Sequence, residues 1–147
     1  MFKGHYVNSI NEKGRVSIPS KFREVLNGWE ADHLVVTKGL DKCLTAYAPE
    51  EWERMEKKAS GLSSIRSADI IFQRHVMGSA EECQIDAQGR ILIPSSLREY
   101  AGLKKKCLIM GVTSRFEIWD VDAYDTYMKE ALKDPDSLRE KLAELGL

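Results

Sequence analysis

A fourteen-residue pattern that occurs twice constrains the fold of this chain more than any other feature of its sequence. Residues 10–23 read INEKGRVSIPSKFR, and residues 85–98 read IDAQGRILIPSSLR. The copies are 75 residues apart, align without a gap and are identical at seven of the fourteen positions. Two copies are too few for a solenoid, whose stacked repeats bury one continuous core. We therefore expect two similar halves that face each other across a pseudo-two-fold axis.

Each copy predicts the same short series of elements. A glycine, Gly14 or Gly89, follows polar residues and predicts a tight turn, because glycine adopts positive φ without a steric penalty. The residues after it are rich in β-branched side chains and predict a short strand, which Pro19 or Pro94 ends. Since proline suits the start of a helix, we expect short helices after the prolines, from Ser20 to about Leu26 and from Ser95 to about Ala101.

The doubled pattern resembles the SpoVT-AbrB DNA-binding domain, and two copies in a chain of this length, the first close to Met1, resemble the MraZ family. The resemblance covers nearly the whole chain. It implies an α+β fold in which two SpoVT-AbrB half-repeats form an intramolecular swapped-hairpin β-barrel with flanking helices. Two positions depart from the family pattern, because Asn11 stands in place of aspartate and Gln88 in place of lysine. The second departure removes a cation from the second copy.

The same resemblance implies a function. It predicts a sequence-specific DNA-binding transcriptional regulator of the bacterial division and cell-wall gene cluster, which binds direct repeats in double-stranded promoter DNA. It also implies a cytoplasmic, nucleoid-associated homo-oligomer, a closed ring that is an octamer or a dodecamer, with no cofactor and no membrane partner. Two alternatives stay open: an antitoxin-like protein whose tail folds onto a toxin, and a structural ring-forming protein without DNA affinity.

The rest of the chain divides around the two copies. We expect the first repeat in residues 1–60, a connecting helix in residues 61–78, the second repeat in residues 79–132 and a helical tail in residues 133–147. Apolar residues outside the pattern also match at an offset of 72, and the matching pairs are Leu44 and Phe116, Tyr47 and Trp119, and Trp52 and Tyr124.

Composition excludes several classes of protein. Hydrophobic residues make up 43% of the chain, as in soluble globular proteins, and no apolar run approaches the roughly 18 residues of a membrane span. Cys43, Cys83 and Cys107 are too widely spaced for a zinc site or a disulfide framework, so we expect buried thiols. The sequence has no nucleophile elbow, zinc-protease motif or phosphate-binding loop, and we expect no enzymatic activity.

The charge is distributed unevenly along the chain. The net charge of the whole protein is −1, whereas DNA-binding domains are usually basic. Residues 1–24 carry five basic and two acidic side chains, a net charge of +3, and residues 120–147 carry four basic and eight acidic ones, a net charge of −4. The basic end therefore coincides with the first copy of the pattern, and repetition of that face in an oligomer would strengthen a weak attraction to phosphate.

Arg15 and Arg90, at the tips of the two predicted turns, are the main candidate DNA-binding residues. An arginine in this place can donate two hydrogen bonds to O6 and N7 of guanine, or it can hold a phosphate. The alternative is an ion pair with Glu12 or Asp86 that only stabilises the turn.

Further residues of the two copies extend this candidate interface. We expect Lys13 to contact phosphate and Gln88 to do so without charge. Arg23 and Arg98 lie near helix starts, where backbone N–H groups also attract phosphate, and the alternative for both is a solvated helix face. The remaining candidates are Gly14, Gly89, Lys21 and Lys3. Three consecutive lysines at 104–106 are interpreted as a solvated loop.

Overall fold

The computed structural model describes all 147 residues, and its first half follows the predicted order of elements. This half contains β1 (His5–Ser9), β2 (Arg15–Ser17), α1 (Ser20–Gly28), β3 (His33–Lys38), β4 (Leu44–Tyr47) and α2 (Pro49–Ala59). The glycine between β1 and β2, Gly14, has φ of +93°, so the turn uses the backbone freedom that the sequence predicted.

The second half repeats these elements after a connecting segment. The connection is α3 (Ser67–Phe72) followed by a π-helical turn, η1 (Gln73–Met77), both of which lie within the residues predicted as a connecting helix. The repeated elements are β5 (Glu81–Gln84), β6 (Arg90–Leu92), α4 (Ser95–Ala101), β7 (Lys106–Val112), β8 (Arg115–Asp120) and α5 (Val121–Ala131). A last helix, α6 (Asp136–Glu144), has no counterpart in the first half.

The strands form a six-stranded antiparallel sheet in the order β1-β7-β8-β4-β3-β5 and a separate two-stranded ribbon, β2-β6. The ribbon is linked to the large sheet through a bridge between Ile10 and Val16. The first hairpin of each half pairs with the other half, since β1 pairs with β7 and β5 pairs with β3. The structure thus confirms the predicted α+β fold with hairpins swapped inside one chain.

The core lies between the sheet, the ribbon, α1 and α4, and it contains side chains from both copies of the pattern. Val16 and Ile91, at the centre of the ribbon, are each only 1% exposed. Phe2, Phe22 and Phe116 form a cluster whose ring centroids are 5.2–5.3 Å apart. Such aromatic contacts bury large apolar areas, and they tie the chain start, α1 and β8 together.

The aromatic pairs outside this core confirm the match at an offset of 72. The rings of Tyr47 and Trp52 lie 5.5 Å apart where β4 leads into α2, and those of Trp119 and Tyr124 lie 5.4 Å apart where β8 leads into α5. The same strand-to-helix corner is therefore built twice. The helix starts also agree with the prediction, because α1 begins at Ser20 and α4 at Ser95, each directly after a proline.

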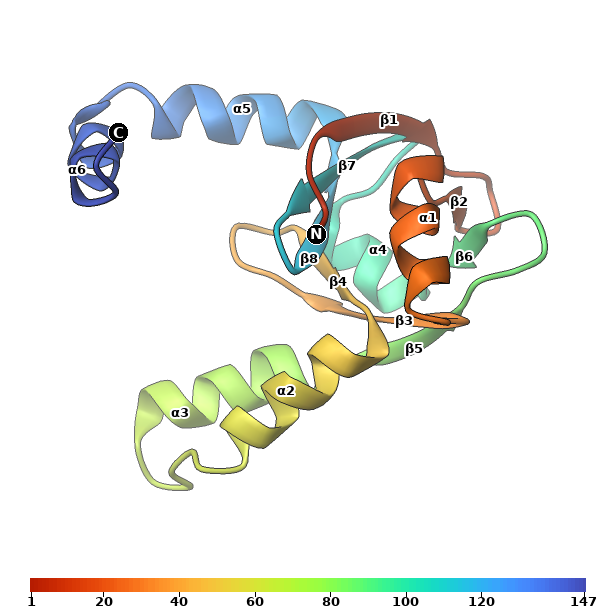
Figure 1. Cartoon of the computed structure of the whole chain (residues 1–147), viewed down its shortest axis with the longest axis horizontal. Helices are drawn as coiled ribbons and strands as arrows, with labels where there is room; N and C mark the ends of the chain where they lie inside the picture. Colours follow the sequence, from red (N-terminus) through yellow and green to blue (C-terminus); the bar gives the residue numbers. More distant parts are fainter.

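Two helical arms extend from the barrel (Figure 1). In one, α2 and α3 pack side by side around an apolar hollow of 440 Å³ that Met55, Leu62 and Phe72 help to line. In the other, Asp120 caps the start of α5, and its carboxylate accepts a hydrogen bond of 3.1 Å from the N–H of Ala123. Helix α5 then leads to α6, away from the sheet (Figure 1). None of the helices is long and apolar enough to cross a membrane.

Candidate nucleic-acid interface

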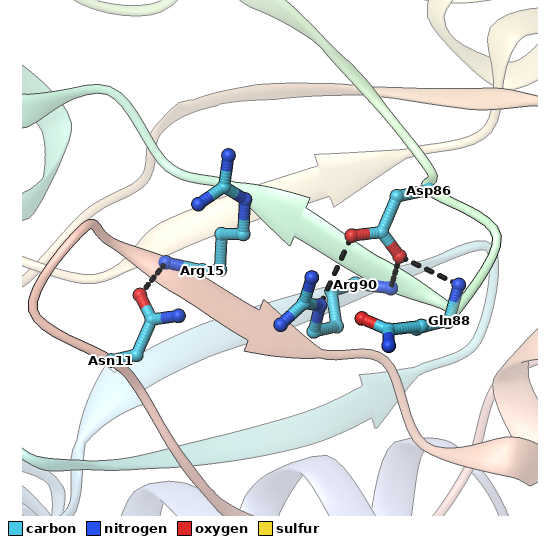
Figure 2. A network of polar contacts seen from close by, with 5 residues as sticks. All are labelled: Asn11, Arg15, Asp86, Gln88 and Arg90. Atoms are coloured by element: carbon cyan, nitrogen blue, oxygen red, sulfur yellow. Dashed lines mark hydrogen bonds and ion pairs between the residues drawn. The ribbon is translucent and has the colours of Figure 1, made fainter.

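The ribbon β2-β6 places Arg15 and Arg90 on one face. Arg15 lies opposite Leu92, and Arg90 lies opposite Ser17. Because side chains alternate between the two faces of a strand, the buried Val16 and Ile91 point into the core and the two arginines point outward. The arginines are diagonal neighbours on antiparallel strands, with a separation of roughly 7–8 Å expected for that relation (Figure 2). The fold thus brings together two residues that are 75 positions apart.

Each turn is held by a side chain that begins it. The Oδ1 atom of Asn11 accepts hydrogen bonds from the N–H groups of Lys13 at 3.0 Å and Arg15 at 2.9 Å. Asp86 does the same for Gln88 and Arg90, at 2.9 Å each. An amide and a carboxylate can both accept these bonds, so the substitution at position 11 leaves the turn geometry intact.

The two turns differ in what the arginine side chain does. Arg90 Nε donates to Asp86 Oδ2 at 3.0 Å, and the Arg90 side chain is 34% exposed. The Arg15 guanidinium has no hydrogen-bond or ion-pair partner, because Asn11 offers no carboxylate and Glu12 lies beyond ion-pair distance. In Figure 2 this guanidinium points away from Asn11. Hydrogen bonds from the N–H of Arg90 and then from its guanidinium lower the pKa of Asp86. The ion-pair alternative therefore holds for Arg90 and not for Arg15.

Arg23 and Arg98 cross from each half to the turn of the other. Arg23 Nε donates to the carbonyl of Ile18 at 3.1 Å, and its side chain packs so closely on Gly89 that a Cβ there would lie 2.5–2.9 Å from it. Arg98 packs in the same way on Gly14, where a Cβ would lie 2.7–2.8 Å from Nε and Cζ. Each glycine thus allows a close approach, and each arginine supports the opposite turn.

The remaining predicted residues lie in different places. Lys13 is exposed in the first turn, and Lys21 is exposed in the first turn of α1. Gln88 is exposed at the position equivalent to Lys13. Lys3 is exposed as well, but β1 separates it from the first turn, so the structure does not bring it to the ribbon.

A basic segment that the sequence did not assign to the interface lies beside the first turn. The N–H of Ile10 donates to the carbonyl of Lys105 at 2.9 Å, and Ser9 pairs with Lys106. All three lysines at 104–106 are exposed. The interpretation as a loop is correct for Lys104 and Lys105, but their position next to the turn was missed, because it depends on the pairing of β1 with β7.

The cysteines of the chain do not form a reactive cluster. Cys43, Cys83 and Cys107 are free and buried, as predicted, and they are distributed through the core. Burial raises the pKa of Cys43 to about 12 and the pKa values of Cys83 and Cys107 to about 11. No group of three or more His, Cys, Asp or Glu side chains is arranged to hold a metal ion.

Comparison with known proteins agrees with this geometry. A family model described as "MraZ protein, putative antitoxin-like" matches residues 1–75 and again residues 76–145. Proteins named transcriptional regulator MraZ from Acetivibrio thermocellus and Ligilactobacillus salivarius are 45% and 43% identical to the chain, each over the full length of both proteins. The protein of that name from Pelotomaculum thermopropionicum is 45% identical over the whole chain and 99% of its own length. By its sequence over both halves, the chain belongs to the MraZ family.

Proposed function

We propose that this protein is a sequence-specific DNA-binding transcriptional regulator. The observation that supports this most strongly is the outward position of Arg15 and Arg90 as diagonal neighbours on one two-stranded ribbon. Its relatives from Acetivibrio thermocellus and Ligilactobacillus salivarius carry the name transcriptional regulator. The major groove of B-DNA admits a two-stranded β-ribbon, and arginine bound to O6 and N7 of guanine is the commonest specific contact there.

The two arginines have unequal roles in this proposal. Arg15 is free to form a bidentate contact with a base or a phosphate, whereas Arg90 must first leave Asp86. Lys13 extends the first turn with a phosphate contact. Arg23 and Arg98 support the turns by packing on Gly89 and Gly14. The Nε atom of each donates to a backbone carbonyl, so only the terminal guanidinium nitrogens can contact DNA.

We propose that the protein acts as a homo-oligomer, a closed ring as the family resemblance implies. The exposed apolar side chains of the C-terminal arm support self-association. Leu138 and Leu142 of α6 are 49% and 39% exposed, and Leu145, which directly follows α6, is 65% exposed. Adjacent subunits would then bind successive promoter repeats about one helical turn, roughly 10 bp, apart. Regulation of the division and cell-wall gene cluster from the nucleoid is part of the same proposal.

An antitoxin-like role is the second candidate, because the description of the matching family model contains that term. In this case the apolar face of α6 would bind a toxin. Expression of the chain alone separates the candidates. A stable assembly of defined size favours the regulator, and a monomer that gains mass only with a co-expressed toxin favours the antitoxin.

The deciding experiment is a fluorescence titration of a labelled DNA fragment from upstream of the encoding gene, at two salt concentrations. We expect affinity to fall as salt rises, because each neutralised phosphate releases counterions. Arg15→Ala should weaken specific binding by about 1–3 kcal/mol, roughly 5- to 150-fold. Arg90→Ala should weaken it less, since its charge is already paired. Binding that is absent or independent of salt would exclude the regulator.

A further inference from the structure

We propose that the lysines at 104–106 are a phosphate-binding extension of the first turn, and that phosphate contacts therefore concentrate at this end of the barrel. This inference rests on the function proposed above and names residues that the sequence pattern does not contain. It starts from the loop between α4 and β7, which carries three cations and contacts Ile10, the residue before the first turn.

Backbone contacts fix the loop against the first turn. The N–H of Ile10, one residue before the turn, donates to the carbonyl of Lys105 at 2.9 Å, and Ser9 is the antiparallel partner of Lys106. The side chains of all three lysines are exposed, and none lies within ion-pair distance of a carboxylate. Their ammonium groups are available for another anion.

Two acids lie beside the loop, but neither forms an ion pair with its lysines. Asp120 and Asp122 line a hollow of 410 Å³ together with the three lysines. Asp120 is 6% exposed and accepts the N–H of Ala123 at the start of α5, so its charge is engaged with that helix start. Asp122 is exposed in the first turn of the same helix and forms no ion pair.

The equivalent place at the other end of the barrel has the opposite charge. There the N–H of Ile85 donates to the carbonyl of Asp32 at 3.0 Å, and Gln84 pairs with His33. The pseudo-two-fold axis therefore replaces the three lysines with Ala31, Asp32 and His33. The carboxylates of Asp32 and Asp86 help to line a hollow of 330 Å³ beside the second turn. The two ends therefore have the same backbone hydrogen bonds but side chains of different charge.

The charges show how strongly the ends differ. Residues 11–15 and 104–106 carry five cations and one carboxylate, a net charge of +4, which becomes +2 when Asp120 and Asp122 beside the loop are included. The equivalent residues 86–90 and 31–33 carry one cation and two carboxylates, a net charge of −1. The single cation, Arg90, is also paired with Asp86. A polyanion is attracted to the first end and repelled by carboxylates at the second, so phosphate contacts should concentrate at the first.

The test neutralises the loop and measures salt dependence. The variant carries Lys104→Gln, Lys105→Gln and Lys106→Gln, and the matched control carries Lys57→Gln, Lys58→Gln and Lys129→Gln, three exposed lysines of α2 and α5. Circular dichroism and size-exclusion chromatography first establish that both variants keep the fold and assembly size of the wild type. Each is then titrated with the upstream fragment and with a random-sequence duplex of equal length.

We expect the slope of log affinity against log salt to become shallower by about 0.9 for each phosphate that the protein no longer neutralises, up to about 2.7 for the loop variant. The same relation gives roughly a hundredfold weaker binding at about 0.15 M salt, equally on both duplexes, because phosphate contacts carry no sequence information. The control should bind as the wild type does. A wild type without salt-dependent binding overturns the proposed function and this inference together. A wild type that binds, with a loop variant indistinguishable from the control, overturns this inference alone.

Discussion

Replacement of Gly89 by alanine should destabilise the protein through a contact between the two halves. Gly89 has φ of +76°, a conformation that is unfavourable for alanine by about 1–2 kcal/mol. The new Cβ would also lie 2.5–2.9 Å from Nη1, Cδ and Cζ of Arg23, so that side chain must move. If it loses its hydrogen bond to Ile18, which has a charged donor, a further loss of about 1.5–3 kcal/mol follows.

The expected total is about 2.5–5 kcal/mol, a large part of the roughly 5–15 kcal/mol that stabilises a typical domain. Gly102→Ala is the matched control, since Gly102 has φ of +59° and a Cβ added there would meet no atom within 4 Å. It should lose only the conformational part, about 1–2 kcal/mol. Urea unfolding followed by tryptophan fluorescence, at a single protein concentration, measures both changes.

A double-mutant cycle isolates the contact with Arg23. In an Arg23→Ala background the obstructing side chain is gone, so Gly89→Ala should lose about as much as Gly102→Ala does. The coupling energy should then be about 2 kcal/mol. Two results would refute a role for Arg23 as a support of the turn: Gly89→Ala no more harmful than Gly102→Ala, or effects of Gly89→Ala and Arg23→Ala that simply add.

Three further predictions concern the charge, the assembly and the thiols. Asp86→Asn should tighten DNA binding in the titration above, because it removes the carboxylate that pairs with Arg90. The asparagine Oδ1 can still accept the turn N–H groups, as Asn11 does in the first turn. The lowered pKa of Asp86 stabilises the fold at pH values above the unfolded pKa of about 3.9, and this contribution is lost as pH falls through the folded pKa. On acidification the urea midpoint of Asp86→Asn should therefore decline less than that of the wild type, and an equal decline would contradict this. The double variant Leu138→Asp, Leu142→Asp should reduce the assembly size in analytical ultracentrifugation, and an unchanged mass would exclude α6 from the subunit contact. Its thermal midpoint should fall by no more than a few degrees, because both side chains are substantially exposed. Iodoacetamide at a pH of about 8 should alkylate the three cysteines only after unfolding, since burial raises their pKa values and covers the sulfur atoms, and rapid labelling of native protein would contradict the buried positions.

Local signals in the sequence were sufficient for the elements and for the two turns that carry Arg15 and Arg90. The glycine turns, the prolines that end β2 and β6, and the contacts of Trp52 with Tyr47 and of Tyr124 with Trp119 all depend on residues close in the chain, and the structure contains each of them. The signals for Arg23 and Arg98 were incomplete. Their spacing after the prolines was clear, but a contact with a glycine in the other half has no signature in a single copy.

The sequence by itself determined that two equivalent units exist, because an ungapped repeat of fourteen residues requires the same backbone twice. Only the tertiary structure decided which charges from outside the repeat lie beside each turn. The hairpin swap pairs β1 with β7 and β5 with β3, and it thereby brings three lysines to the first turn and Asp32 to the second. Charge acts through space rather than along the chain, so the local field at each arginine depends on strand pairing that the repeat alone does not specify.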